Sequence, residues 1–148
     1  TTSGNQLLLA SPDNGLARFE FVAGFWLSTW SSANWLTSDT VAGVERVGST
    51  LFVLSGDALH SYNTTNGVFS TTYDLSTLGL AYDGVSLLTW PSTAGAAPSS
   101  DALLVDDGSG QLVHLSPGQT PFVEGAIRLA SAPATDDMTA LVELDDVL

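Results

Sequence analysis

One short pattern occurs three times in this chain and restricts the folds that it can adopt. The copies are residues 15–19 (GLARF), 58–62 (ALHSY) and 111–115 (QLVHL). An apolar run and an Asp-containing turn precede each copy, and a glycine follows it, at Gly24, Gly67 and Gly118. A second, shorter match relates residues 48–51 (GSTL) to 84–87 (GVSL). Self-similarity of this kind predicts a fold built from repeated supersecondary units.

Strand signals fill most of the chain, and helix signals are almost absent. Short runs of β-branched, aromatic and aliphatic residues alternate with turn clusters. The turns contain Asn66-Gly67 and Asp83-Gly84, whose residues tolerate positive φ. These patterns predict an all-β fold, with strands at residues 6–10, 16–22, 25–30, 41–47, 50–54, 58–63, 68–74, 79–82, 85–90, 102–105, 111–115, 121–123, 127–129 and 139–144.

The middle of the chain resembles one four-stranded blade of a bacterial β-propeller. The resemblance rests on residues 43–54 (GVERVGSTLFVL), 58–63 (ALHSYN) and 67–73 (GVFSTTY), and residues 78–84 (LGLAYDG) resemble the first strand of the next blade. No WD40 or kelch signature accompanies it, so it implies a fold and no activity. It implies antiparallel four-stranded repeats in a single domain, residues 1–148, with units at 5–40, 41–77 and 78–126 and terminal strands in 127–148.

The expected strands are too few for a closed propeller, which typically has about four to eight four-stranded blades. Terminal apolar faces and strand edges would be exposed unless a partner covers them. We therefore expect a propeller-like fold that is incomplete in one chain and is completed by copies of itself or by other assembly proteins. The alternative is a β-sandwich whose hairpins only resemble blades. Residues 31–40 and 91–100 exceed the common unit, and we expect these insertions to make contacts outside the repeat core.

Acidic residues dominate the charge of the chain. It has 16 Asp and Glu against three Lys and Arg, and its formal net charge is −13. Nucleic acids and anionic membrane surfaces both recruit Lys and Arg, so we expect neither as a partner. No apolar run approaches the roughly 20 residues of a membrane-spanning helix. The sequence contains no cysteine, which excludes disulfides and thiolate metal sites.

The sequence contains no recognisable catalytic motif. Its two histidines, His60 and His114, occupy neighbouring positions of the repeat and lack the spacing of zinc ligands. Asp106 and Asp107 are candidate Ca²⁺ ligands in an acidic turn, but the rest of a calcium-binding loop is missing. Ordinary turn formation by Asp and Gly is the alternative. We expect no catalytic residue, no enzyme activity and no cofactor.

Tryptophans form the strongest candidate binding site. Trp26, Trp30 and Trp35 lie within ten residues of one another, and Trp90 precedes the second insertion. An exposed Trp stacks on sugars or anchors a protein interface, whereas a buried Trp belongs to the core. Trp26 and Trp30 are an even number of residues apart and would share one face of a strand. Trp35, in the first insertion, is the best candidate for a surface binding residue.

These features favour a non-catalytic structural or interaction protein in a multi-subunit assembly. We expect this assembly to be a homo-oligomer in an extracellular setting or on the surface of a virus particle, as a decoration or tail-associated protein. The alternative is a carbohydrate-binding, propeller-like lectin, which would use the tryptophans to bind a glycan. A hydrolase ranks third because no pair of convergent carboxylates can be placed in the sequence.

Overall fold

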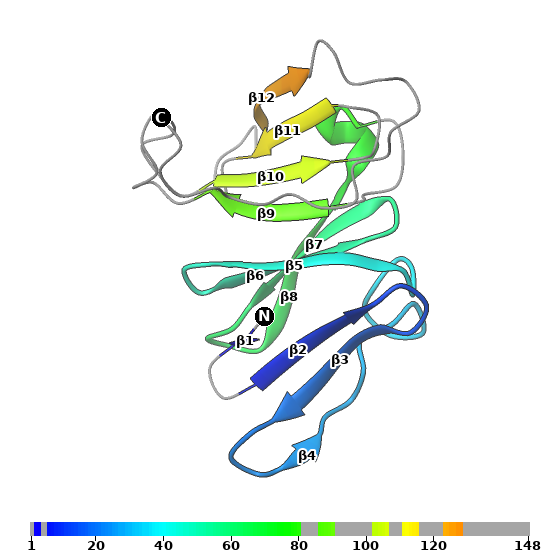
Figure 1. Ribbon diagram of the computed structural model, residues 1–148, viewed down its shortest axis with the longest axis vertical. Coiled ribbons are helices and arrows are strands. Elements are labelled where there is room, and N and C mark those ends of the chain that lie inside the picture. Colours follow the sequence, from blue (N-terminus) through cyan, green and yellow to red (C-terminus); the bar gives the residue numbers. More distant parts are fainter. Residues whose placement is uncertain are drawn as a thin grey trace, which may run out of the picture.

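The computed structural model describes residues 2–3, 6–80, 86–90, 102–106, 111–115 and 123–128, and in this part the chain folds into three four-stranded antiparallel sheets (Figure 1). Each sheet contains four strands that are consecutive in the chain. The first has β1 (Thr2–Ser3), β2 (Gln6–Ser11), β3 (Gly15–Glu20) and β4 (Phe25–Trp26). The second has β5 (Val41–Val47), β6 (Thr50–Ser55), β7 (Ala58–Asn63) and β8 (Val68–Asp74). The third has β9 (Ser86–Trp90), β10 (Ala102–Asp106), β11 (Gln111–Leu115) and β12 (Val123–Arg128).

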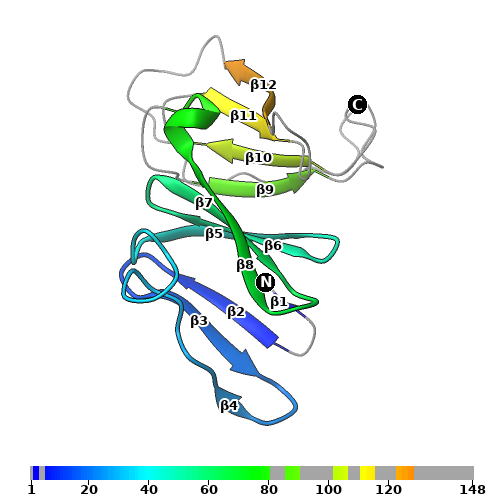
Figure 2. The ribbon, with the colours of Figure 1, turned by 180° about the vertical axis from the view of Figure 1, so that it is seen from behind.

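The three sheets follow one another in chain order along the long axis of the molecule (Figures 1 and 2). Their contacts involve β2 with β5 and β5 with β9. This arrangement confirms the all-β, propeller-like fold expected from the sequence. A sandwich has two sheets, whereas the described residues form three sheets that follow one another. The described residues form three such sheets, fewer than the roughly four to eight blades of a closed propeller.

The repeated sequence pattern marks the same strand in each sheet. Residues 15–19, 58–62 and 111–115 lie in β3, β7 and β11, which are the third strands of their sheets. The shorter match of residues 48–51 with 84–87 has no such meaning. It aligns Leu51, in the second strand of its sheet, with Leu87, in a first strand. The three-copy pattern therefore gives the structural equivalences between sheets, and the two-copy pattern does not.

Two expected strands are placed differently by the structure. The strand expected at 127–129 is not separate, because β12 carries residues 127–128 into the third sheet. The strand expected at 79–82 is absent from Gly79 and Leu80, because the 3₁₀ helix η1 (Leu75–Leu78) precedes them and ends at Gly79, with φ 86°; residues 81–82 lie outside the described residues. The helix begins at Leu75 because the carboxylate of Asp74 accepts a hydrogen bond from the Ser76 N–H, at 2.8 Å. The first strand of the third sheet is β9 and not the expected 78–84 segment. The strand expected at 139–144 lies outside the described residues.

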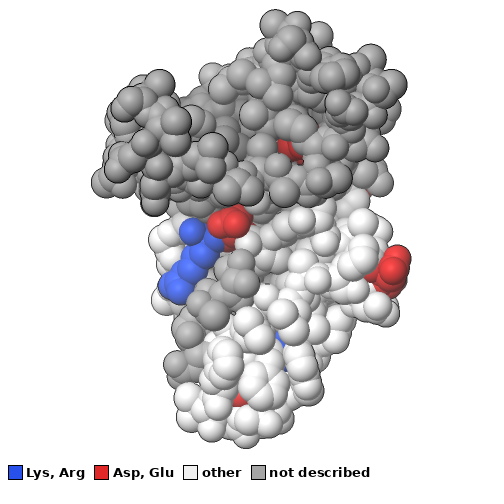
Figure 3. Space-filling view, in the orientation of Figure 1, with Lys and Arg blue, Asp and Glu red and all other residues white. Residues whose placement is uncertain are grey.

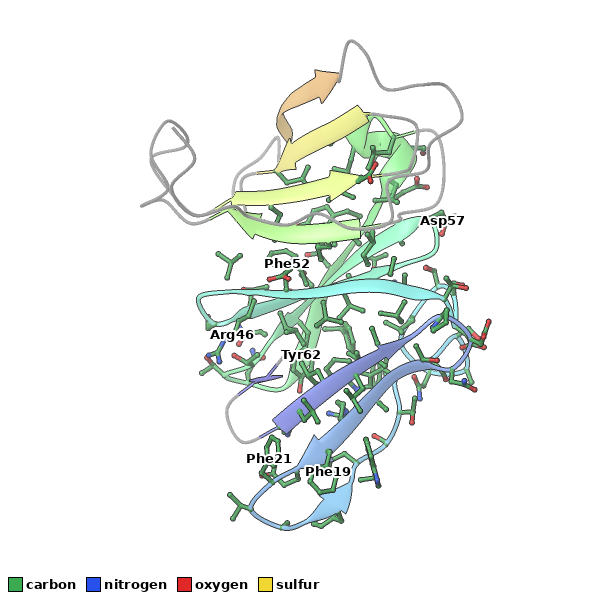
Figure 4. All side chains as sticks on the ribbon, viewed as in Figure 1. Phe19, Phe21, Arg46, Phe52, Asp57 and Tyr62 are labelled. Atoms are coloured by element: carbon green, nitrogen blue, oxygen red, sulfur yellow. The ribbon has the colours of Figure 1, made fainter. Side chains whose placement is uncertain are left out.

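The core has two parts, one on each side of the second sheet. Strand β6 supplies both, because alternate residues of a strand point to opposite faces. Leu51 and Val53 join the part shared with the first sheet, and Phe52 and Leu54 join the part shared with the third. Figure 4 shows Phe52 between the second and third sheets. The apolar run in β6 is therefore continuous because both faces of the second sheet are covered.

The second and third sheets are in close contact at Gly43. A Cβ atom at this position would lie 2.7 Å from the Cβ of Leu87. Real Cβ atoms do not tolerate such a distance, so a side chain at residue 43 would push β5 and β9 apart. Gly43 is thus required by the contact between the sheets.

Candidate functional site

Trp30 is a core residue. Only 3% of its surface is exposed, and its ring centroid lies 4.6 Å from that of Tyr62 and 4.9 Å from that of Phe69. The guanidinium carbon of Arg18 lies 4.4 Å from the centre of the Trp30 ring. Burial lowers the pKa of Arg18, and Tyr62 opposes this shift. Trp30 is therefore unavailable as a surface binding residue, which corrects the expectation from the sequence.

Trp26 and Trp30 lie on opposite faces of the first sheet, and the expected shared face is wrong. Trp26 pairs with Phe19 on β3, whereas Trp30 forms an isolated bridge with Leu16 on the same strand. Leu16 and Phe19 are an odd number of residues apart, so they point to opposite faces. The rule of even spacing fails here because β4 ends at Trp26 and the chain reaches Trp30 outside a regular strand.

Trp35 lies on the surface. Its side chain is 57% exposed, and its ring stacks on Phe69 with centroids 5.5 Å apart and an interplanar angle of 18°. Val68, next to Phe69 on β8, is also exposed. We call these three residues the Trp35 platform. Phe69 also contacts the buried Trp30, so the platform is continuous with the core beneath it.

The 31–40 insertion holds Trp35 in a turn that is closed by hydrogen bonds. The backbone N–H groups of Trp35 and Leu36 both donate to the carbonyl of Ser31, at 3.0 Å. The Ser31 N–H donates to Oδ1 of Asn34, at 2.8 Å. Leu36 is buried in the core and anchors the turn. The sequence of the insertion therefore fixes the backbone on which Trp35 is carried.

Polar groups around the buried Ser55 attach the end of this insertion to the second sheet. The hydroxyl of Ser55 donates to the carbonyl of Ser38 at 2.7 Å and accepts from its N–H at 3.1 Å. The Thr37 hydroxyl donates to the Ser55 carbonyl at 2.9 Å. Asp39 Oδ1 accepts from the Ser32 N–H at 2.7 Å, a bond that lowers the pKa of Asp39. The insertion is thus fastened to the sheet.

His60 belongs to the same attachment. Its Nε2 accepts from the Thr37 N–H at 3.3 Å, and its Nδ1 lies 3.0 Å from the hydroxyl of Thr72. Burial lowers the pKa of His60, and the nearby Asp57 raises it in part. A neutral ring with the proton on Nδ1 satisfies both bonds. His60 therefore has a structural role in holding the insertion, whereas the side chain of His114 lies outside the described part.

A second exposed aromatic group lies at the end of the β3–β4 hairpin. It includes Phe21, Phe25 and Trp26, which are 55%, 52% and 58% exposed. Phe19 contacts both Phe21 and Trp26 edge-on, with centroids 5.7 and 5.2 Å apart. Figure 4 shows Phe19 and Phe21 together at this end of the molecule. Sequence reasoning noticed Trp26 but missed Phe21, although apolar residues on both sides of a turn at Gly24 are a usable signal.

The remaining candidates give no site in the described residues. Trp90 ends β9, and its side chain lies outside the described part, as does all of Asp107. Asp106 ends β10 and is fully buried, so it does not lie in an exposed calcium-binding turn. The described segments contain no group of three or more His, Cys, Asp or Glu that could hold a metal ion. Within them no helix is long and apolar enough to cross a membrane.

Comparisons with known proteins show the fold. No family model matches the sequence, and no curated protein matches it significantly. The crystal structure of BBS1N in complex with ARL6DN is similar to 93% of this chain, with a TM-score of 0.60 and 15% identity. The extracellular domain of the putative hybrid two-component system BT3049 from B. thetaiotaomicron is similar to 76% of it, with a TM-score of 0.56 and 16% identity.

The matched region spans 35% of the first of these chains and 15% of the second. Both neighbours are β-propeller-like domains. At these identities the likeness concerns the fold alone. The chain therefore has the stacked antiparallel sheets of a β-propeller-like fold, and no family signature is found in its sequence.

Proposed function

We propose that this chain is a non-catalytic protein-interaction module and that the Trp35 platform is its contact surface for a partner protein. The observation that carries the proposal is the combination of high exposure and a fixed backbone at Trp35. The side chain is 57% exposed, while the insertion that carries it is hydrogen-bonded internally and to the second sheet. A side chain that is only structural would not need to be displayed in this way.

Physical reasons favour such a residue as a binding anchor. Trp buries a large area when it binds and loses little conformational entropy, so it is common among the residues that dominate interface energies. A loop that is already ordered pays little further entropy on binding. The stacking on Phe69 also fixes the orientation of the Trp35 ring before a partner arrives. The platform is therefore preorganised.

Fold and charge support a protein partner. One neighbour of this fold was solved in complex with another protein. The net charge of −13 disfavours nucleic acids and acidic surfaces and favours a neutral or basic partner surface. An extracellular or virion-surface assembly stays a prediction from the sequence.

Selection of peptides from a random display library on the immobilised chain tests this proposal. The selected peptides are then measured against the unchanged chain, Trp35→Ala and Trp26→Ala. We expect Trp35→Ala to weaken binding by roughly 30-fold or more, as for an interface anchor, and Trp26→Ala to have little effect. Selected peptides that bind Trp35→Ala as tightly as the unchanged chain would overturn the proposal.

A glycan array provides the discriminating arm, because a lectin would use the same exposed Trp. Glycan binding that is lost in Trp35→Ala, together with no peptide that depends on Trp35, would replace the protein partner by a carbohydrate. If the chain binds no glycan on the array, the peptide experiment alone decides whether the Trp35 platform binds a protein.

A further inference from the structure

The first sheet has an apolar face that points away from the second sheet. On its other face, Leu8 and Leu16 are buried against the second sheet. Alternate residues of a strand point to opposite faces, so the neighbours of Leu8 on β2 and of Leu16 on β3 point outward. Their cross-strand partners share this outward face. We call these residues the outward face: Leu7, Leu9, Ala17, Phe19 and Trp26.

The same face is buried in the other two sheets. In register, the pair Leu7 and Phe19 corresponds to Leu51 and Tyr62 in the second sheet and to Leu103 and Leu115 in the third. The next pair, Leu9 and Ala17, corresponds to Val53 and His60 and to Val105 and Val113. Every member of these corresponding pairs except Tyr62 is buried, and Tyr62 packs on Trp30 of the preceding segment. In the first sheet, by contrast, Leu9 is 43% and Trp26 58% exposed.

We propose that the outward face binds a sheet of a second copy of this chain, as the second and third sheets bind the sheets before them. At both described interfaces, the face that corresponds to the outward face packs against the opposite face of the preceding sheet. That opposite face carries a fully buried leucine in its third strand, which is Leu16 in the first sheet and Leu59 in the second. The third sheet keeps a leucine at the same repeat position, Leu112. By backbone register, each copy therefore has strand positions of both kinds that pair within the chain.

This contact is head to tail, and the number of sheets that it joins is one that closed propellers have. The third sheet of one copy would precede the first sheet of the other, so the two contact surfaces differ. Two copies together contribute six described sheets, within the roughly four to eight blades of closed propellers. The proposal goes beyond the proposed function because it concerns a different surface from the Trp35 platform.

Charge opposes the association and gives it a measurable salt dependence. Each copy has a net charge of −13, so two copies repel each other at low ionic strength. No residue of the outward face is charged. Figure 3 shows few Arg, Asp or Glu atoms over the lower part of the molecule, where β2 to β4 lie. Salt screens the repulsion and strengthens burial of apolar surface, so association should increase with salt.

Sedimentation velocity of the 148-residue chain over a range of protein concentrations, at about 0.05 M and about 1 M salt, tests the proposal. We expect a species of twice the 15.4 kDa chain mass, more populated at high salt. Trp26→Glu should weaken association at least about tenfold. Trp35→Glu is the matched control, since it makes the same change at a residue of equal exposure, and it should leave association unchanged. A chain that stays monomeric under all conditions, or equal effects of the two variants, would overturn the proposal.

Two further variants keep the result interpretable. Leu9→Glu repeats the perturbation on another strand if Trp26→Glu loses its circular dichroism spectrum. Leu9→Cys distinguishes head-to-tail from face-to-face contact, because the chain has no other cysteine. In a head-to-tail ring the two outward faces do not meet, and no disulfide-linked dimer forms on mild oxidation. Rapid formation of that dimer would show that two outward faces meet and would refute the head-to-tail arrangement.

Discussion

Replacement of Trp30 by alanine should be among the most destabilising single changes in the first sheet. Large-to-small substitution of a buried Trp costs about 3–5 kcal/mol in free energy of unfolding. The value should approach the upper end, because Trp30 also loses ring contacts with Tyr62 and Phe69, each worth about 0.5–1.5 kcal/mol, and the cation contact with Arg18. For a domain whose total stability is about 5–15 kcal/mol, this is a large fraction.

Trp35→Ala provides the comparison that makes the Trp30 value meaningful. Trp35 is 57% exposed and makes one described ring contact, with Phe69, so its removal should cost only about 0.5–1.5 kcal/mol. Both variants remove the same atoms from the chain. Only the placement of the residue differs between them.

Urea denaturation followed by far-ultraviolet circular dichroism measures both variants, because tryptophan fluorescence would change with the substitution itself. With a slope of about 2 kcal/mol per molar urea, Trp30→Ala should lower the midpoint by roughly 2 M and Trp35→Ala by well under 1 M. If Trp30→Ala leaves too little folded protein, Trp30→Phe should still lower the midpoint measurably. Equal shifts for Trp30→Ala and Trp35→Ala, or a Trp30→Ala midpoint like that of the unchanged chain, would refute the placement of Trp30 in the core.

Three further outcomes test the contact between the second and third sheets and the attachment of the 31–40 insertion. Gly43→Ala should lower the melting temperature, because its Cβ would meet Leu87 and the overpacking costs about 1–3 kcal/mol; an unchanged value would contradict this contact. Ser55→Ala leaves the Ser38 N–H without its buried acceptor and should cost about 1–3 kcal/mol while speeding hydrogen exchange of that amide. Burial holds the pKa of His60 in the folded chain below its ordinary value of 6.5. The unfolded chain therefore takes up the proton first as the pH falls. The contribution of His60 to stability is full above about pH 6.5 and decreases as the pH falls from there toward the pKa of the folded chain. A His60→Gln variant should lose this part of the pH dependence, and an identical slope in both proteins would argue against a buried neutral ring.

The sequence alone was enough to predict the all-β, propeller-like fold and the four strands of the second sheet. Residues 15–19, 58–62 and 111–115 identified the third strand of every sheet, because a repeated strand keeps the same alternation of inward and outward residues. It was also enough to separate Trp35, in an insertion, from the regular strands. The short match at residues 48–51 misled because four residues with one glycine and one leucine recur by chance.

Placement of the other tryptophans could not be predicted. The two faces of the first sheet are distinguished by its pairing, and Trp30 reaches the inner face only because the chain leaves β4 after Trp26 and returns to pair with Leu16. The sequence predicted exposed terminal faces, but for the same reason it could not show which residues form the outward face. Leu7 and Leu9 have the same apolar character as their buried counterparts in the second sheet, Leu51 and Val53, and only the sheet order shows that nothing in the described part of the chain covers them.

Fluorine NMR of the chain labelled with fluorotryptophan tests the central claim, that Trp30 lies in the core, Trp35 on a free platform and Trp26 on the outward face that a second copy covers. Each of the four tryptophans gives one resonance, assigned by single Trp→Phe substitutions, and the shift between H₂O and D₂O reports solvent exposure. At low protein concentration we predict large shifts for Trp26 and Trp35 and a small one for Trp30. At high concentration and high salt, the Trp26 shift should decrease while that of Trp35 stays large. A large shift for Trp30, or a Trp26 shift that does not respond to concentration, would contradict the account.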